Sequence, residues 1–300
     1  MFIDTHAHMD HRRFDSDRNA ILNIARDSGI KVMINPAIDF ETNYTMREKL
    51  DVYDWIFYGV GIHPNRVGTD DIRDEVWESG LLKLAAKDNR KVVDIGETGL
   101  DFHRLSRNCF GQLDENGIVS LSRQYKWFRK QIQLASMLNL PLILHIRNAN
   151  EENIRAVNNI VSDSEIDCID AHKEAIKILS EFQDDLKPEI KGVVHCFNSN
   201  QVEDAIMYTS MGYLLGIGGS LTFSQNEKLR EIVRIIPIDR VVLETDCPYV
   251  MSEGLAGKRN TPINIPYIAR TIADLKGMDV NDVARITTDN AKRLFHLNDC

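Results

Sequence analysis

The chain contains eight short apolar segments, most of which end in a polar residue or a glycine. They are rich in Val, Ile and Leu and apolar at consecutive positions, which is typical of parallel strands that are buried on both faces. The segments are Phe2–Asp4, Lys31–Asn35, Trp55–Gly61, Lys91–Gly96, Leu140–His145, Gly192–Cys196, Gly212–Ile217 and Arg240–Glu244.

Apolar residues spaced three and four positions apart predict helices between most of these segments. A stripe from Ile21 to Ser28 stops at Gly29, and another from Ile265 to Ile272 follows Pro262 and stops near Gly277. Strand and helix alternate along the whole chain, which predicts an α/β fold of the closed (β/α)8 TIM barrel type, with residues 1–300 as a single domain. A doubly wound open sheet is disfavoured because no Gly-x-Gly-x-x-Gly follows the first strand.

Two connections are longer than a barrel needs. Residues 104–122, after the fourth strand, are rich in turn-forming residues and lack a clear period. Residues 151–191, after the fifth strand, are mostly charged, and weak stripes at 154–161 and 175–182 predict two helices there. Long insertions after strands 4 and 5 would lie at the catalytic face, where they shape substrate access or only decorate the surface; both interpretations remain open.

Residue types that bind metal ions recur where the predicted strands end. His6 and His8 are two residues apart, so on an extended strand they project from the same side. Glu97 directly follows the fourth segment and is flanked by Gly96 and Gly99, which permit a tight turn. The full set of candidates is His6, His8, Glu97, His145, His195 and Asp246.

Each of these residues alone would be an ordinary polar residue at a strand end, but the combination predicts a metal centre. The carboxyl ends of the strands are where barrel enzymes build their active sites. Four imidazoles and two carboxylates suffice for two divalent ions bridged by one carboxylate. Two such ions polarise a phosphoryl or carbonyl oxygen and lower the pKa of a shared water.

Composition narrows the class of protein. The net charge is −9, so any anionic substrate has to be held locally rather than by a global positive field. No apolar run approaches the roughly 20 residues of a membrane span, and no signal-peptide pattern opens the chain. The five cysteines are odd in number and contain no Cys-x-x-Cys, which predicts free thiols and a cytoplasmic location.

Taken in order, the motifs resemble those of the TatD-type metal-dependent hydrolases of the amidohydrolase superfamily. They cover the whole chain except the two insertions. The matching segments are Asp-Thr-His-Ala-His at 4–8, Gly-Ile-His-Pro at 61–64, Gly-Glu-Thr-Gly-Leu-Asp at 96–101, Leu-His-Ile-Arg at 144–147, His-Cys-Phe at 195–197, Glu-Thr-Asp-Cys-Pro-Tyr at 244–249, Gly-Lys-Arg-Asn at 257–260 and Asn-Ala-Lys-Arg-Leu-Phe at 290–295.

The resemblance implies two divalent ions, Mg, Mn or Zn, and hydrolysis of phosphodiester bonds, typically in DNA, with a 3′–5′ exonuclease mode on single strands. Asp246 and Glu97 would be the catalytic residues. Carried over residue by residue, the family pattern places His6, His8 and Asp246 on one ion, His145 and His195 on the other, and Glu97 between them.

The resemblance also implies substrate contacts, for which spacing alone offers ordinary alternatives. His63 would reach the substrate phosphate, although a strand-end residue before Pro64 is an equal interpretation. Arg147 is expected as a second phosphate contact, and otherwise as a surface arginine. Lys258 and Arg259 would hold a phosphate backbone, or form a solvated basic pair.

We therefore expect a divalent-metal-dependent hydrolase in which Asp246 orients or deprotonates the attacking water and Glu244 supports the site from behind. The expected partner is DNA, as a single strand or a strand end, with no membrane and no obligate protein partner. The same ligands are compatible with an ester or amide hydrolase, such as an aminoacyl-tRNA deacylase. A non-enzymatic barrel would be expected to lack ligands, and none is missing. His11, His172 and His296 fit no motif, and Asn198 stands where the family usually has a small Ser.

Overall fold

The computed structural model describes residues 1–67, 74–85, 90–105, 115–149, 170–187, 189–254 and 259–297. Eight strands form one sheet, in which neighbours are parallel and follow the order of the chain. The strands are β1 (Phe2–Asp4), β2 (Ile30–Pro36), β3 (Ile56–Val60), β4 (Val92–Asp101), β5 (Leu142–Arg147), β6 (Gly192–His195), β7 (Tyr213–Ile217) and β8 (Val241–Leu243). The predicted (β/α)8 barrel is confirmed.

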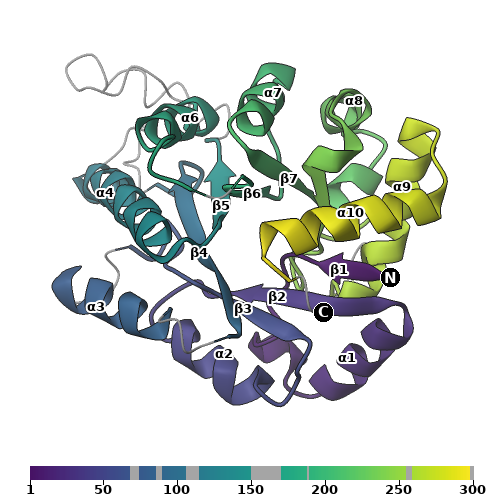
Figure 1. Ribbon diagram of the computed structural model, residues 1–300, viewed down its shortest axis with the longest axis horizontal. Coiled ribbons are helices and arrows are strands. Elements are labelled where there is room, and N and C mark those ends of the chain that lie inside the picture. The colour runs from purple at the N-terminus through teal and green to yellow at the C-terminus, as the bar shows by residue number, and fades with distance from the viewer. Residues whose placement is uncertain are drawn as a thin grey trace.

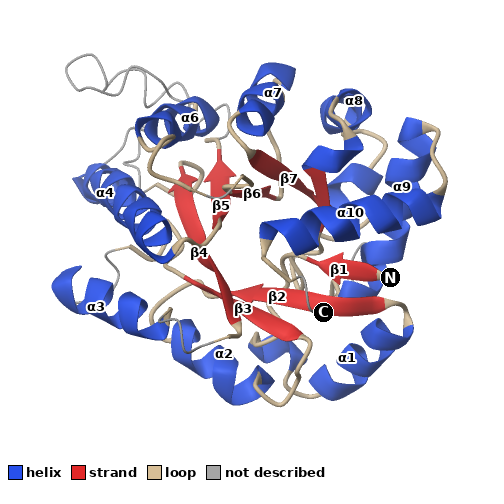
Figure 2. Ribbon diagram, viewed as in Figure 1, coloured by secondary structure: helices blue, strands red, loops and turns tan. Residues whose placement is uncertain are grey.

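Helices surround the strands on the outside (Figures 1 and 2). None of the described helices has the length and apolar character needed to cross a membrane. The α-helices are α1 (Arg18–Asp27), α2 (Thr42–Leu50), α3 (Asp74–Leu84), α4 (Glu115–Leu138), α6 (Ala171–Glu181), α7 (Val202–Ser210), α8 (Glu227–Ile235), α9 (Ile265–Lys276) and α10 (Val280–Leu294). Short 3₁₀ turns are η1 (Arg12–Phe14), η3 (Gly219–Thr222), η4 (Ile238–Arg240) and η5 (Pro262–Asn264).

Helix boundaries follow the chemistry of their end residues. α1 stops before Gly29, which has φ of 94°, and α9 is closed by Gly277 at φ of 64°. Both values lie in the left-handed region, which glycine adopts without steric cost. Pro262 opens the turn that leads into α9. Both predicted stops are therefore confirmed.

One apolar cluster fills the inside of the barrel, because its members come from strands on all sides of the ring yet contact one another. Ala291, Leu294 and Phe295 of α10 belong to the same cluster. α10 lies over the ring of strands beside β1 in Figure 1, and Asn290 donates a hydrogen bond to the carbonyl of Val241, at the start of β8. The amino ends of the strands are thus closed by apolar side chains, which leaves the carboxyl ends for chemistry.

The barrel closes where the beginning of the chain meets strand β8. The Thr5 N–H and hydroxyl both donate to the Leu243 carbonyl at 3.0 Å. The buried carboxylate of Asp4 accepts the Thr245 N–H at 3.0 Å and the Thr245 hydroxyl at 2.6 Å. Asp4 therefore joins the ends of β1 and β8, a role that sequence analysis did not give it.

Strand β4 is longer than predicted, and the connection after it is shorter. β4 continues through Glu97 to Asp101, and α4 begins at Glu115, so residues 115–122 are helical instead of a loop. α6 confirms the second helix predicted in the later insertion. The first predicted helix of that insertion, at 154–161, lies outside the described residues.

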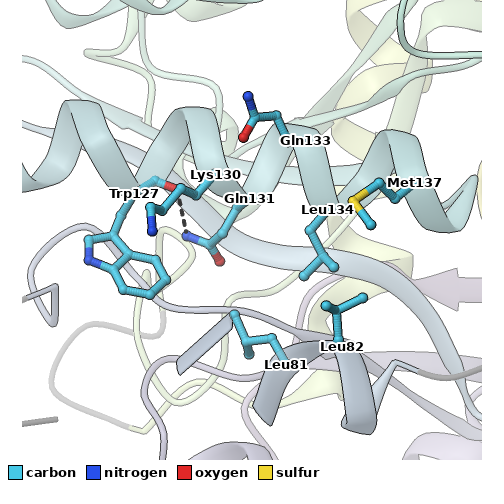
Figure 3. A pocket seen from close by; sticks show the side chains of 8 residues that line it. All are labelled: Leu81, Leu82, Trp127, Lys130, Gln131, Gln133, Leu134 and Met137. Carbon is cyan, nitrogen blue, oxygen red and sulfur yellow. Dashed lines mark hydrogen bonds between the residues drawn. The ribbon is translucent and has the colours of Figure 1, made fainter. Parts of the chain in front are cut away.

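Helix α4 explains the length of β4. The side chain of Gln124 bonds both the N–H and the carbonyl of Asp101, at 2.8 and 3.1 Å. Gln131 accepts the Ile62 N–H at 2.8 Å and donates to the Thr98 hydroxyl at 2.7 Å. Figure 3 shows Gln131 beside a mostly apolar hollow between α3 and α4. Two buried amides thus satisfy backbone groups that a regular strand pair would otherwise satisfy.

Candidate metal centre

The six predicted donors converge at the carboxyl ends of the strands. The seam between β1 and β8 sets three of them: the Asp246 N–H donates to the His6 carbonyl at 2.8 Å, and the His8 N–H donates to the Cys247 carbonyl at 2.8 Å. These bonds hold the two histidines against the aspartate, although they lie about 240 positions apart in sequence. Glu97 and His145 instead come from within β4 and β5, and His195 ends β6.

His6, His8 and Asp246 form what we call the first pocket. The Nε2 atoms of His6 and His8 lie 3.2 Å apart. Asp246 Oδ1 is 3.7 Å from His6 Nε2 and 3.4 Å from His8 Nε2. Both imidazoles are buried. Three donor atoms thus face one point.

His145 and His195 form the second pocket. His145 Nδ1 lies 3.3 Å from His195 Nε2. His145 therefore faces the cluster with Nδ1, whereas His6, His8 and His195 face it with Nε2. The ring of His195 also stacks on that of His6, with centroids 3.8 Å apart, so the two pockets are adjacent.

Glu97 lies between the pockets and turns one oxygen to each. Its Oε2 is 3.6 Å from His6 Nε2 and 3.7 Å from His8 Nε2. Its Oε1 is 2.9 Å from His145 Nδ1 and 3.0 Å from His195 Nε2. Ligand atoms about 2.1 Å from one ion lie about 3.4 Å apart in a tetrahedral site, so these separations fit a metal ion in each pocket. The buried cluster is consistent with a binuclear metal site.

The protonation of the carboxylates also suits metal binding. Burial acts to raise the pKa of Glu97, but the surrounding imidazoles, led by His195, hold it well below its ordinary value. Burial likewise opposes ionisation of Asp246, and its hydrogen bond with His8 and the charge of His195 keep its pKa lowered. Both groups are therefore anionic near neutral pH, the state in which carboxylates bind metals.

Asp101 fixes the orientation of His145. Its Oδ2 accepts from His145 Nε2 at 3.2 Å, which leaves the Nδ1 lone pair of His145 directed at the second pocket. Asn65 donates to the same Asp101 oxygen at 2.6 Å. Neither Asp101 nor Asn65 is among the predicted site residues. The available signal was that Asp101 lies four positions after Glu97, on the same face of an extended strand.

Glu244, which was expected to support the site from behind, lies beside the other histidine of the second pocket. Its Oε1 lies 3.6 Å from His195 Nδ1 and accepts the Cys196 N–H at 2.5 Å. The carboxylate is fully buried and occupies the space beside Gly216, where a Cβ would lie 2.2 Å from Oε2. A larger residue at position 216 would therefore displace Glu244.

The predicted substrate contacts fall into two groups. His63 Nε2 lies 3.6 Å from Glu97 Oε1, and its ring is 4.1 Å from that of His145. Arg147 ends β5 two residues after His145 and so shares its face of the strand. Arg259 is already bound: its guanidinium makes bonds of 2.9 and 2.6 Å to the carboxylate of Asp17. Lys258 lies outside the described residues.

Comparison with known proteins agrees with this geometry. A family model described as TatD related DNase matches residues 3–296. The chain belongs to the TatD-related DNase family. It is a metal-dependent hydrolase of that family, and the buried histidines and carboxylates at the carboxyl ends of the strands are consistent with a binuclear metal site.

Relatives and solved structures span the full chain. The uncharacterized metal-dependent hydrolase YabD of Bacillus subtilis is 33% identical over 300 residues, which cover 99% of this chain and 100% of YabD. A 3′-5′ ssDNA/RNA exonuclease TatD of a Rahnella strain is 30% identical over 296 residues, 95% of each chain. The crystal structure of YJJV, a TatD homologue from Escherichia coli, has a TM-score of 0.79 at 25% identity and covers 98% of both chains.

Proposed function

We propose that the chain is a two-metal phosphodiesterase that removes nucleotides from the 3′ end of single-stranded DNA, with residues 1–300 acting as one catalytic domain. The proposal is carried by Glu97, whose two oxygens face two separate pockets of donor atoms. Membership of a DNase-related family supports the substrate class. The exonuclease described in Rahnella supports the direction of cleavage.

In this proposal the six donors divide as their distances suggest. A mixed imidazole and carboxylate set accepts Mg²⁺, Mn²⁺ or Zn²⁺. Bound there, two ions would polarise a phosphoryl oxygen and lower the pKa of a water between them. His6, His8 and Asp246 would hold one ion, His145 and His195 the other, and Glu97 both.

Asp246 is the proposed general base. Its lowered pKa makes it anionic at neutral pH, so it can accept a proton from the attacking water. Unlike Glu97, which faces both pockets, Asp246 faces only the first pocket. Its position beyond β8, outside the regular strand, places it at the open end of the barrel.

His63 is the proposed donor to the substrate phosphate. Its Nδ1 accepts the Asn65 N–H at 3.0 Å, so the ring proton is on Nε2, which faces the cluster. Burial, together with the charge of His145, lowers the pKa of His63 to about 3, so the ring stays neutral. A neutral Nε2–H can donate to a phosphate oxygen without competing for a metal ion. Arg147, at the end of β5, would contribute a positive charge to the same phosphate.

The test is cleavage of 3′- and 5′-labelled single-stranded DNA by the purified protein with Mg²⁺ or Mn²⁺, with EDTA, and with Glu97→Ala. We expect a ladder that shortens from the 3′ end and is lost with EDTA and in the variant. Glu174→Gln is the matched control, because Glu174 is also a buried carboxylate but bonds Tyr125 at 3.1 Å instead of the cluster.

Each other outcome changes the assignment. Shortening from the 5′ end would overturn the direction and leave the phosphodiesterase intact. Two bound ions without cleavage of DNA would overturn the substrate, and turnover of an aminoacyl ester on tRNA would then identify the alternative. A protein that binds no divalent ion would overturn the metal centre itself.

A further inference from the structure

A solvent-facing aromatic ring lies beside the first pocket. Tyr249 follows Asp246 by three residues, donates its N–H to the Asp246 carbonyl at 2.9 Å, and is 43% exposed. Its ring meets those of His8 and His11 at centroid distances of 5.9 and 5.6 Å, with interplanar angles of 71° and 74°. Both imidazoles are near perpendicular to it, so within the described ranges no ring lies parallel on Tyr249. A planar base can therefore stack there.

The loop that leaves His8 places two cations directly after His11, whose ring contacts that of Tyr249. The His11 N–H donates to the His8 carbonyl at 3.2 Å, and the 3₁₀ turn η1 follows at once with Arg12 and Arg13. Both arginines are exposed. Neither has an ion-pair partner in the part of the chain that the structure describes, whereas nearby Arg18 pairs with an aspartate at 2.5 Å.

The loop is held in place by contacts that leave those two guanidinium groups free. Arg259 donates to the Arg13 carbonyl, and its guanidinium lies 4.4 Å from the centre of the Phe14 ring. His11 Nδ1 accepts the Arg13 N–H at 3.1 Å. The backbone of the turn is thus fixed by two side chains, while the side chains of Arg12 and Arg13 face solvent.

An exposed aromatic ring beside two unpaired arginines is typical of a site that binds single-stranded nucleic acid. The chain as a whole carries a charge of −9, so two unpaired arginines at the edge of a metal cluster are a local exception. Sites for single-stranded nucleic acid pair cations, which hold phosphates, with aromatic rings, on which unpaired bases stack. A small ester needs neither, and a paired duplex does not offer the face of an internal base.

We propose that His11, Arg12, Arg13 and Tyr249, which we call the loop patch, form a subsite for one nucleotide of a single-stranded nucleic acid next to the bond that is cleaved. The base stacks on Tyr249, with His11 beside it, and the arginines hold an adjacent phosphate. This inference rests on the proposed function, because it assumes that the substrate is a nucleic acid.

The first experiment compares Tyr249→Ala and Tyr249→Phe for binding and cleavage of a short oligothymidylate and of the same strand made abasic. We expect Tyr249→Ala to weaken binding of the oligothymidylate about tenfold and to raise KM more than it lowers kcat. The Phe variant should behave as the parent. On the abasic strand the parent and the Ala variant should be equal. Tyr267→Ala is the matched control, because Tyr267 is also 43% exposed but lies on α9.

The second experiment measures the salt dependence of binding for the double variant Arg12→Gln, Arg13→Gln. Each phosphate that is no longer neutralised on a single strand reduces the slope of log K against log salt by about 0.7, so loss of the one adjacent phosphate should reduce it by about 0.7. Metal content should equal that of the parent, since neither arginine belongs to either pocket. This measurement is independent of any local change that Tyr249→Ala causes near Asp246.

The outcomes separate this inference from the proposed function. If the parent neither binds nor cleaves oligonucleotides, the proposed function fails. If the parent cleaves them but Tyr249→Ala behaves like Tyr267→Ala and the salt slope is unchanged, the loop patch has no such role and the function stands. Equal loss on the normal and abasic strands would also overturn base stacking.

Discussion

The two pockets of the candidate metal centre are built in different ways. The first pocket, with His6, His8 and Asp246, is held by backbone hydrogen bonds across the seam between β1 and β8. The second pocket, with His145 and His195, stands on regular strands. A carboxylate lies behind each of its imidazoles: Asp101 is hydrogen-bonded to His145, and Glu244 lies 3.6 Å from His195.

The difference affects the charge of each metal-free pocket. Burial lowers the pKa of His6, and the neighbouring carboxylates do not offset this effect. Burial also acts to lower the pKa of His8, but the hydrogen bond and charge of Asp246 outweigh it, so the pKa of His8 is raised. In the second pocket burial is outweighed for both histidines: Asp101 and Glu97 raise the pKa of His145, and Cys196, Glu97 and Glu244 raise that of His195. The second pocket therefore has more protons to lose when it binds a metal.

The largest expected effect on metal binding and activity comes from removing Glu97, the residue that faces both pockets. Glu97→Ala deletes one oxygen from each pocket, so we expect neither to retain its ion in dialysis and activity to fall by about 10³-fold or more. Metal content measured by mass spectrometry checks this. Retention of two ions per chain would show that Glu97 does not bridge.

A second large effect is the pH dependence of metal binding. Metal binding requires neutral imidazoles, so affinity rises with pH up to the pKa values of the histidines that must lose protons. At a pH below the raised pKa values of His8, His145 and His195, the second pocket should release about two protons and the first about one, from His8. Affinity should then change about 100-fold and about tenfold per pH unit, respectively.

Calorimetric titration with Mn²⁺ in buffers of different ionisation enthalpy counts those protons for each binding step. The comparison between the pockets would be refuted if both steps released the same number. A decrease in affinity with rising pH over this range would refute the assignment of histidine ligands altogether.

A smaller effect on metal affinity is expected from Asp101, the carboxylate behind His145. Asp101→Asn removes the charge that orients His145, so affinity for one of the two ions should fall about 10- to 100-fold while the other is unchanged. Glu174→Gln again serves as a control. Equal loss at both binding steps would mean that Asp101 acts on the whole site instead of on His145.

The smallest effect on metal affinity is expected from Asn65, which contacts Asp101 but neither of the two pockets. Asn65→Ala removes the 2.6 Å hydrogen bond to Asp101 but leaves the bond between Asp101 and His145 in place. The metal affinity that Asp101→Asn lowers should fall about three- to tenfold in Asn65→Ala. An effect as large as that of Asp101→Asn would show that Asn65 contributes more than support.

The strands, the two helix ends and the six donors could be predicted from the sequence, because each leaves a signal within a few consecutive residues. Buried parallel strands are continuous apolar runs, so all eight strands were found, and the glycines that stop α1 and α9 were readable as helix ends. All six donors of the cluster were found because each lies in or just beyond a strand. That these residues bind metal stays a prediction.

Residues that act through contacts distant in sequence were missed. Asn65 reaches Asp101 across 36 positions, and Arg259 reaches Asp17 across 242, and neither pairing leaves a local signal. The extension of β4 to Asp101 depends on amides of α4, which a strand pattern does not contain. Tyr249 and His11 likewise meet only through the folded loop.

The seam between β1 and β8 also decides when the protein can first act. The first donor is residue 6 and the last is residue 246, and the backbone of each holds the other in place. During synthesis, every nascent chain that ends before Asp246 therefore has an incomplete first pocket. A chain truncated before β8 is expected to lack hydrolytic activity, so activity is expected only when synthesis is nearly complete.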